Sequence, residues 1–330
     1  MEYVKLGNTE LNVSRICLGC MAFGDNDPTG LHRWAIDEQH SHEILKEALE
    51  LGINFFDTAN IYSAGKSEEL LGSGIKKFAR REDVILATKV FFNEYEGSKN
   101  ITGLSRTAIL SEIDKSLVRL QTDYVDLYII HRFDYNTPVE ETMAALTEVV
   151  KAGKARYIGA SAMFAWQFLK MQMTAEKLGL TKFVSMQNHL NLIYREEERE
   201  MLPLCKEQGV AITPYSPLAG GRLIRDVGTQ TDRSKLDHIN DGKYGTTIDI
   251  DKPIIERVAE IANKHGVKRI AVALAWLIQK DICAVPLCGA TKVNHPIDAA
   301  EAIGFTLTQD EITYLEEPYL PHKVVGALVK

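Results

Sequence analysis

Long apolar runs are missing from this sequence. The longest strongly apolar stretch, residues 270–278, is far shorter than the roughly 20 residues that a membrane-spanning helix needs. The first residues, MEYVKLGNTELNV, lack the apolar core of a secretory signal peptide. We therefore expect a cytoplasmic protein without a membrane partner.

Cysteine is also scarce, because five residues in 330 make no disulfide framework. Cys17 and Cys20 form a C-x-x-C pair, which could be a redox pair or half of a zinc site. No second C-x-x-C or C-x-x-H motif supplies the remaining ligands, and Cys17 lies in an apolar, strand-like run. We predict that these cysteines pack in the core, and we expect no metal site.

A surplus of positive charge is absent as well. The net charge is -7, with 38 Lys and Arg against 45 Asp and Glu. This balance argues against a nucleic-acid partner, although it leaves room for local basic pockets. With 45% hydrophobic residues, the chain can bury a large core. We expect residues 1–330 to form a single domain.

What the chain does contain is an alternation of short apolar runs and amphipathic helical segments. The runs predicted as strands are residues 16–18, 55–57, 84–89, 124–131, 157–159, 184–187, 211–215 and 284–287. Eight strand-helix units with short connections predict an α/β fold, the (β/α)8 TIM barrel. The rival is an open doubly wound sheet, but GCMAFG at residues 19–24 misplaces two glycines of the phosphate turn that such a fold carries.

Other local signals fill in this fold. Residues 1–13 are predicted to form a β-hairpin that turns at Gly7-Asn8 and caps one end of the fold. Thr137-Pro138-Val139-Glu140 is typical of a capping box with proline at the first helical position. The long loop after strand seven, residues 220–251, is irregular and polar. We interpret it as a lid over a ligand, with a mobile surface loop as the alternative.

The stretch FFDTANIYSAGKSEELLG, residues 55–72, is the centre of the predicted site. Asp57 ends a buried strand, Tyr62 follows in a short loop, and Ser67 is predicted to cap the next helix. Lys89 ends strand three and His131 ends strand four. Because a barrel collects its active site at the C-terminal ends of its strands, we expect these side chains to converge.

The chemistry of this set indicates proton transfer. Lys89 follows an apolar run, so its ammonium needs a carboxylate, and Asp57 is on the adjacent strand. An ammonium ~4 Å from the Tyr62 phenolate contributes on the order of 4 kcal/mol at an effective dielectric of about 20, so that the phenol could protonate a carbonyl oxygen while His131 orients the carbonyl. Taken singly, each residue also fits a solvated or packing role.

The reduced carbon needs a hydride, which no side chain donates and a cofactor must supply. Tyr215 ends strand seven and could stack on a flat heterocycle. After strand eight, the small residues from Cys288 through Gly289 let backbone approach a phosphate, and Thr291 and Lys292 add a hydroxyl and a cation. An ordinary strand-to-helix turn is the alternative for this segment.

At this point the chain resembles the aldo-keto reductase superfamily over essentially its whole length. The resemblance rests on FDTANIYSAGKSEELLG and on the motifs that follow it in order, ILATK, DLYIIHR, GKARYIGAS, MQNHLN, YSPLAGG and GATK. HRFDYNTPVEET and NLIYREEEREMLPLC are similar to a bacterial branch with aryl-alcohol and deoxyxylulose-related reductases.

The resemblance implies a barrel that binds NADP(H) extended, with a catalytic tetrad of Asp57, Tyr62, Lys89 and His131. The cofactor-binding positions that it implies are Met21, Asp57, Ser161, Gln187, Tyr215, Ser216, Leu218, Gly221, Arg222, Gly289, Thr291, Lys292 and His295. Among them, Ser161 and Gln187 would hold the carboxamide and Tyr215 would stack on the nicotinamide. Ser216 to Arg222 would follow the pyrophosphate, and Thr291 and Lys292 would meet the 2′-phosphate.

The predicted function is NADP(H)-dependent reduction of small aldehydes or ketones. The aromatic residues Phe23, Trp34, Phe91, Phe92 and Tyr95 lie in rim loops and could form an apolar pocket for aromatic or aliphatic aldehydes, or simply pack their loops. Two alternatives stay open. One is a Schiff-base aldolase that uses Lys89, and the other is a nucleotide-sensing regulatory subunit of the same fold. The oligomeric state is left open.

Overall fold

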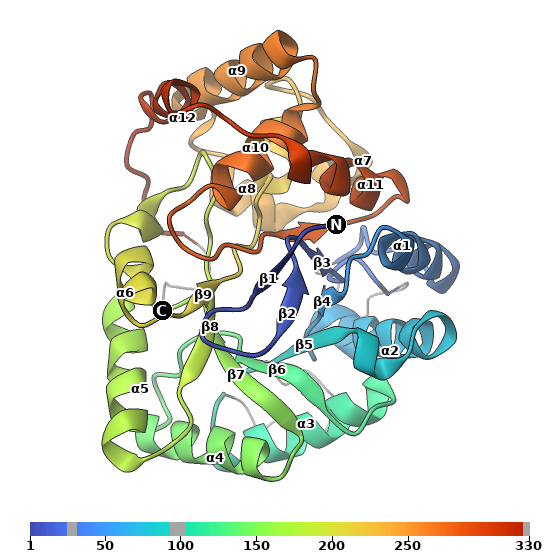
Figure 1. Cartoon of the computed structure of the whole chain (residues 1–330), viewed down its shortest axis with the longest axis vertical. Helices are drawn as coiled ribbons and strands as arrows, with labels where there is room; N and C mark the ends of the chain where they lie inside the picture. The colour runs from blue at the N-terminus through green and yellow to red at the C-terminus, as the bar shows by residue number, and fades with distance from the viewer. Residues whose placement is uncertain (25–31, 93–102, 326–330) are drawn as a thin grey trace.

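The computed structural model describes residues 1–24, 32–92 and 103–325 (Figure 1). Its eight parallel strands form one sheet in the order β10-β3-β4-β5-β6-β7-β8-β9. Their bounds are β3 Cys17–Gly19, β4 Phe55–Asp57, β5 Ile85–Val90, β6 Val125–Ile130, β7 Ala155–Ser161, β8 Phe183–Gln187, β9 Ala211–Ile212 and β10 Leu287–Gly289. The strands thus follow one another around the sheet in chain order, as the repeated strand-helix pattern predicts.

The sheet closes into a barrel between β9 and the residues before β10. Ile212 forms a parallel bridge with Ala284. The Ile212 amide donates to the Cys283 carbonyl at 2.8 Å, and the Val285 amide donates to the Ile212 carbonyl at 2.9 Å. The (β/α)8 prediction is confirmed. The eighth strand lies later than predicted, because residue 284 meets β9 whereas the ladder with β3 begins at Leu287.

The N-terminal hairpin covers one end of the barrel. Strands β1 (Tyr3–Lys5) and β2 (Asn12–Ser14) pair antiparallel and cross the middle of the ring of strands in Figure 1. Gly7 lies in their connection at φ 57°, where a Cβ would come within 2.8 Å of the Ala211 amide. The Asn8 amide donates to the Gly209 carbonyl at 3.1 Å. This contact fixes the hairpin on the barrel end opposite the predicted site.

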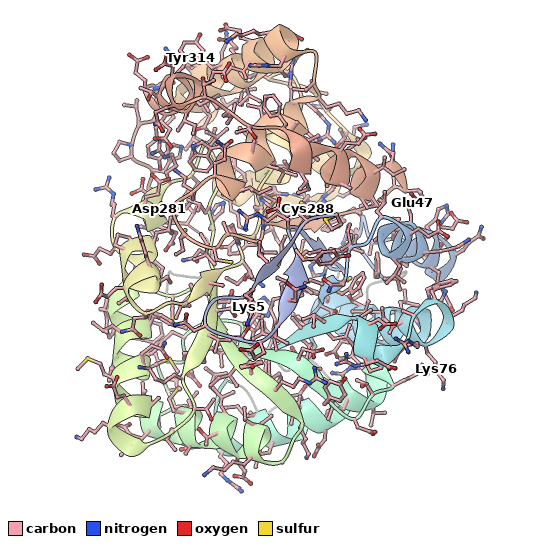
Figure 2. All side chains as sticks on the ribbon, in the orientation of Figure 1. Lys5, Glu47, Lys76, Asp281, Cys288 and Tyr314 are labelled. Atoms are coloured by element: carbon pink, nitrogen blue, oxygen red, sulfur yellow. The ribbon has the colours of Figure 1, made fainter. Side chains whose placement is uncertain are left out.

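Helices surround the barrel, and their apolar faces form the outer core with the strands. Their bounds are α1 Glu38–Glu50, α2 Lys66–Phe78, α3 Arg106–Leu120, α4 Val139–Lys151, α5 Ala165–Leu178, α6 Met201–Glu207, α9 Ile248–His265, α10 Arg269–Ile278, α11 Asn294–Glu301 and α12 Gln309–Glu316. Figure 2 shows Lys76 of α2 and Tyr314 of α12 at the periphery, where the helices face outward. None of the described helices combines the length and apolarity needed to cross a membrane.

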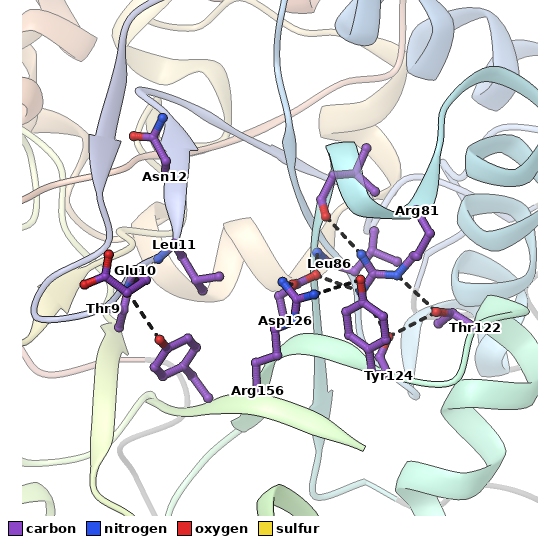
Figure 3. A network of polar contacts seen from close by, with 12 residues as sticks. Thr9, Glu10, Leu11, Asn12, Arg81, Leu86, Thr122, Tyr124, Asp126 and Arg156 are labelled. Atoms are coloured by element: carbon purple, nitrogen blue, oxygen red, sulfur yellow. Dashed lines mark hydrogen bonds and ion pairs between the residues drawn. The ribbon is translucent and has the colours of Figure 1, made fainter. Parts of the chain in front are cut away.

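A charged network joins β5 and β6 below the site (Figure 3). Asp126 is fully buried and accepts from the Arg81 guanidinium at 2.7 Å and from the Leu86 amide at 3.0 Å. Arg156 lies 3.1 Å from the other oxygen of Asp126. Both guanidinium groups pack on the Tyr124 ring, at 4.0 Å and 4.4 Å from its centre. The network therefore holds two strands that carry site residues in fixed register.

Two predicted helix caps are wrong. Helix α2 begins at Lys66, and the Ser67 hydroxyl donates to the Cys20 carbonyl at 2.8 Å instead of capping the helix. Helix α4 begins after Pro138, and the Thr137 hydroxyl donates to the Asp134 carboxylate at 2.6 Å. In both places an acceptor outside the helix takes the hydroxyl that the local pattern assigns to the helix, a distant carbonyl for Ser67 and a carboxylate of the preceding loop for Thr137.

The long connection after β9 is present, but it is not irregular throughout. It contains helices α7 (Asp232–Leu236) and α8 (His238–Tyr244). Tyr244 is fully buried, and its hydroxyl lies 2.6 Å from His189 Nε2 and accepts from the Asn191 amide at 3.0 Å. These contacts anchor the segment to the chain that follows β8.

The cysteines behave as packing residues. All five are free thiols, and Cys17 and Cys20 are buried in the core. In the part of the chain that the structure describes, no group of His, Cys, Asp and Glu could hold a metal ion.

Gly72 offers a test of the packing between α2 and α3. A Cβ at this position would lie 2.5 Å from the Leu120 carbonyl oxygen. We expect Gly72→Ala to lower the free energy of unfolding by about 1–3 kcal/mol, because backbone cannot yield as a side chain does. Gly304→Ala is the matched control, since a Cβ there meets nothing within 4 Å. Equal urea midpoints for the two variants would contradict this packing.

Candidate active site

The site is the polar layer that lies directly above the apolar interior of the barrel. The interior cluster includes, on three neighbouring strands, Phe55, Ala87 and Ile129. Side chains alternate between the two faces of a strand, so the next inward positions toward the C-terminal ends are Asp57, Lys89 and His131. The barrel therefore brings a carboxylate, an amine and an imidazole to one level.

Lys89 is the centre of this layer and is fully buried. Its ammonium donates to Asp57 Oδ1 at 2.5 Å, to the Thr58 carbonyl at 2.8 Å and to Tyr62 Oη at 3.1 Å. Asp57 Oδ2 accepts from the Gln187 amide at 3.0 Å. Burial alone would lower the pKa of Lys89, but Asp57 and Tyr62 hold the pKa above its ordinary value. The amine is thus an ammonium, and each of its three protons is donated to an acceptor.

A left-handed turn places Tyr62 over this ammonium. Ser63, Ala64 and Gly65 have φ of 47°, 54° and 90°, so the chain turns sharply between Tyr62 and α2. Left-handed conformations at Ser and Ala cost on the order of 1 kcal/mol each and persist only where packing enforces them. Ser63 is buried there. The turn fixes the phenol while the following helix continues away from the barrel.

The pKa of Tyr62 differs from the expected direction. Burial raises the pKa of the phenol, and the nearby Lys89 ammonium lowers it by less, so the net pKa is above the ordinary value. The ammonium lowers the pKa of Tyr62, as expected, but in the protein alone burial has the larger effect. The reason is that the phenolate loses its hydration at this depth.

His131 completes the layer. Its ring makes edge-on contacts with Tyr62, at 5.8 Å between ring centres, and with Phe92, at 5.3 Å. Burial, with Lys89 in second place, lowers the pKa of His131 well below its usual value, so the imidazole is neutral. Its Nδ1 is buried and has no hydrogen-bond partner among the described residues. A neutral imidazole keeps one N–H that can donate to a carbonyl.

The predicted aromatic pocket stays a prediction, and the structure places its described residues in three different surroundings. Phe92 lies against His131, and Phe91 packs on Phe92 at 5.1 Å. Trp34 lines the large cavity described below. Phe23, however, is fully buried in the outer core, and its backbone forms a parallel bridge with Ile36. Tyr95 lies outside the described residues.

A cavity of about 860 Å³ opens beside the tetrad. It is lined by ten of the predicted cofactor-binding residues, Met21, Asp57, Tyr215, Ser216, Leu218, Gly221, Gly289, Thr291, Lys292 and His295. Ser161, Gln187 and Arg222 are not part of its lining. Ser161 donates to the Gln187 carbonyl at 3.0 Å. Arg222 lies 3.8 Å from Asp241 and over the Tyr244 ring.

The Tyr215 ring lines this cavity and stacks on a second ring behind it. His189 stacks on it at 5.2 Å and 11°, and Tyr194 stacks on the other side of His189 at 4.0 Å and 13°. Lys243 of α8 also lines the cavity, with its ammonium 4.7 Å from the centre of the Tyr215 ring. Burial lowers the pKa of Lys243 to about 8. The ring thus has a rigid backing and a cation nearby.

Sequence reasoning missed most of the cations around this cavity. Besides Lys292, the lining includes Arg225, Arg233, Lys268 and Arg269. Arg233 packs on Trp34 at 3.8 Å and pairs with Asp237 at 3.1 Å. Arg225 and Arg233 had a signal in the sequence, since they lie in the long polar segment that was predicted to cover a ligand, whereas Lys268 and Arg269 lie at the start of α10 and had none. Which arginines of the long segment face inward depends on the fold of that segment.

Comparison with known proteins agrees with this geometry. The sequence model of the Aldo/keto reductase family matches residues 15–319. The chain is 41% identical over 346 residues to the versiconal hemiacetal acetate reductase of Aspergillus parasiticus, with 98% of each chain covered. It is 41% identical over 351 residues to a protein of Schizosaccharomyces pombe that carries the name of an aryl-alcohol dehydrogenase, with 99% of this chain and 98% of that one covered. The solved structure of the thermostable aldo-keto reductase Tm1743 with the inhibitor epalrestat matches with a TM-score of 0.76 at 29% identity, over 96% of this chain and 100% of that chain.

Fold and site therefore define a barrel oxidoreductase. The chain belongs to the aldo/keto reductase family, as the resemblance of its motifs implied. Members of this family use nicotinamide cofactors and act on small carbonyl compounds. The two relatives named here come from fungi rather than from bacteria, and one carries the aryl-alcohol name that the sequence likeness suggested.

The buried ion pair leads to a stability test. We expect Asp57→Asn to lower the free energy of unfolding by about 3–5 kcal/mol, because it leaves the Lys89 ammonium buried without its carboxylate. Asp57→Asn combined with Lys89→Met should recover part of this loss, since no uncompensated charge remains. Urea unfolding of the wild type, both single variants and the double variant measures the coupling. Additive losses would show that the two side chains do not depend on each other.

Proposed function

We propose that this protein is an NADP(H)-dependent reductase of aldehydes or ketones, with Tyr62 as the general acid. The observation that carries the proposal is the Lys89 ammonium, which bonds both to the buried Asp57 carboxylate and to the Tyr62 hydroxyl. A neutral His131 beside the phenol supplies the second donor that a carbonyl oxygen needs.

Each residue has a defined task in this scheme. The raised pKa of Tyr62 keeps the phenol protonated at neutral pH, which is the form that a reduction requires. When Tyr62 gives its proton to the carbonyl oxygen, Lys89 stabilises the phenolate that is left. Asp57 keeps Lys89 charged and in place. His131 donates to the same carbonyl oxygen and sets its position. NADPH, when bound, supplies the hydride.

The cavity residues fit a phosphorylated dinucleotide. The backed Tyr215 ring is a flat apolar surface at the tetrad end, suited to a nicotinamide. At the other end, Lys292 and Arg225 line the cavity beside the turn after β10. The Thr291 amide donates to His295 Nδ1 at 3.2 Å, which leaves the other ring nitrogen of His295 as a donor. Cations and donors gathered at one end favour a ligand with phosphates there.

The aldolase alternative loses its main support in this geometry. A Schiff base requires a neutral amine that is free to attack a carbonyl carbon. Lys89 instead has a pKa above its ordinary value, and its three protons bond to Asp57, Thr58 and Tyr62. We therefore assign Lys89 an electrostatic task rather than a nucleophilic one.

Tyr62→Phe tests the acid directly. We expect it to lower carbonyl reduction by at least ~10²-fold, the usual worth of a positioned proton donor. NADPH binding, followed by quenching of its fluorescence, should stay within about twofold, since the phenol hydroxyl is assigned to the carbonyl. Tyr314→Phe is the matched control, because Tyr314 lies at the periphery on α12 (Figure 2). Unchanged turnover in Tyr62→Phe would refute the acid assignment.

Lys292 tests the phosphate assignment. We expect Lys292→Ala to weaken NADPH binding by about tenfold or more, the worth of one charged hydrogen bond. NADH binding should change much less, because NADH lacks the 2′-phosphate. Lys46→Ala removes an exposed charge on α1 as the control. Calorimetric titration with both cofactors gives the comparison, and equal losses for NADPH and NADH would remove the assignment.

A further inference from the structure

Arg132 follows His131 at the C-terminal end of β6 and carries a cation that has no anionic partner among the described residues. No ion pair or hydrogen bond of its side chain is present within the described chain, and its Nε is buried without a partner. Burial lowers the pKa of the guanidinium from its usual value. Most partly buried arginines in proteins are paired. This one is held instead against two aromatic rings.

The rings place the cation close to the tetrad. The guanidinium carbon lies 4.5 Å from the centre of the Phe92 ring and 5.4 Å from that of Phe91. The Phe92 ring also makes the edge-on contact with His131. The Phe92 ring is thus in contact with both the His131 imidazole and the Arg132 guanidinium.

The backbone under these rings is fixed. The Phe92 carbonyl accepts from the Asn60 amide at 2.9 Å, and the same amide group donates to Glu112 at 2.9 Å. The Phe91 carbonyl accepts from the Gly103 amide at 3.0 Å. The surface on which Arg132 rests is therefore built into the loop after β5.

The field of Arg132 reaches the site as well. Its charge is among the causes that lower the pKa of His131, after burial and Lys89. The guanidinium is therefore close enough to the imidazole for its charge to act on it.

We infer that Arg132 binds the carboxylate of the substrate, so that the enzyme prefers aldehydes or ketones that carry a carboxylate. This inference rests on the proposed function. A guanidinium binds a carboxylate through two parallel hydrogen bonds, and the Phe91 and Phe92 rings suit the apolar body between the two polar ends. Carboxybenzaldehydes and short aldehyde acids have this shape and charge.

The experiment compares 4-carboxybenzaldehyde with its neutral methyl ester, which keeps the ring and the aldehyde. We expect the wild type to reduce the acid with a kcat/KM about tenfold or more above that of the ester. The difference should lie in KM rather than kcat, because the carboxylate is remote from the reacting carbon.

Variants then assign the preference to one residue. Arg132→Met should bring the ratio of acid to ester close to one, and Arg132→Lys should retain part of it. Arg106→Met is the charge-matched control, since Arg106 is exposed and pairs with Glu148 on the outside of the barrel. Its ratio should match the wild type. Equal kcat/KM for acid and ester in the wild type, or equal losses on both in Arg132→Met, would overturn the inference and leave Arg132 a packing residue.

A binding measurement separates this inference from the proposed function. Titration of 4-carboxybenzaldehyde into the NADP⁺-loaded protein should show binding that Arg132→Met loses by about tenfold or more. If the protein binds the acid in this way yet reduces no aldehyde with NADPH, the anion site stands and the reductase proposal fails. If it reduces the neutral ester but binds the acid no better, the reductase proposal stands and the anion site is wrong.

Discussion

The buried ammonium of Lys89 is the constraint on which the rest of the site depends. A charge at this depth is tolerated only when each of its protons has an acceptor. The three acceptors come from the end of β4 and from the loop that follows it. Satisfying one cation therefore fixes the positions of Asp57 and Tyr62 together. The left-handed turn after Tyr62, which costs free energy on its own, is held in place by the same requirement.

Much of this arrangement could be predicted from the sequence, because it follows from two local regularities. Alternation along buried strands puts Asp57 and Lys89 one step above apolar neighbours, and the parallel barrel brings their strand ends together. What could not be predicted depends on tertiary contacts. Ser67 leaves its helix for the Cys20 carbonyl, and Phe23 turns into the core. The pKa of Tyr62 depends on how deeply the fold buries it.

The long segment after β9, which lines the cavity, could likewise be predicted only in part from the sequence. Its composition predicted a covering element with basic residues, but not which arginines face the ligand. Gly220 and Gly221 have φ of 65° and 94°, and this turn directs Arg222 toward Tyr244. Arg225 then lies against Gly221, where a Cβ would come into contact with its guanidinium, and lines the cavity. The arginine that lines the cavity is therefore Arg225, three residues after Arg222, the position that the resemblance implies.

Lys89 and Arg132 lie at the same mouth and differ in how completely they are satisfied. Lys89 has an acceptor for every proton, so it has no capacity left for a ligand and acts only through its field on Tyr62. Arg132 rests on ring faces, which attract its charge but accept none of its N–H groups in the manner of a carboxylate. Only the cation with unused donors has the capacity to bind an anionic ligand. If both proposals hold, proton transfer and substrate selection depend on different cations, which differ in their hydrogen-bonding states.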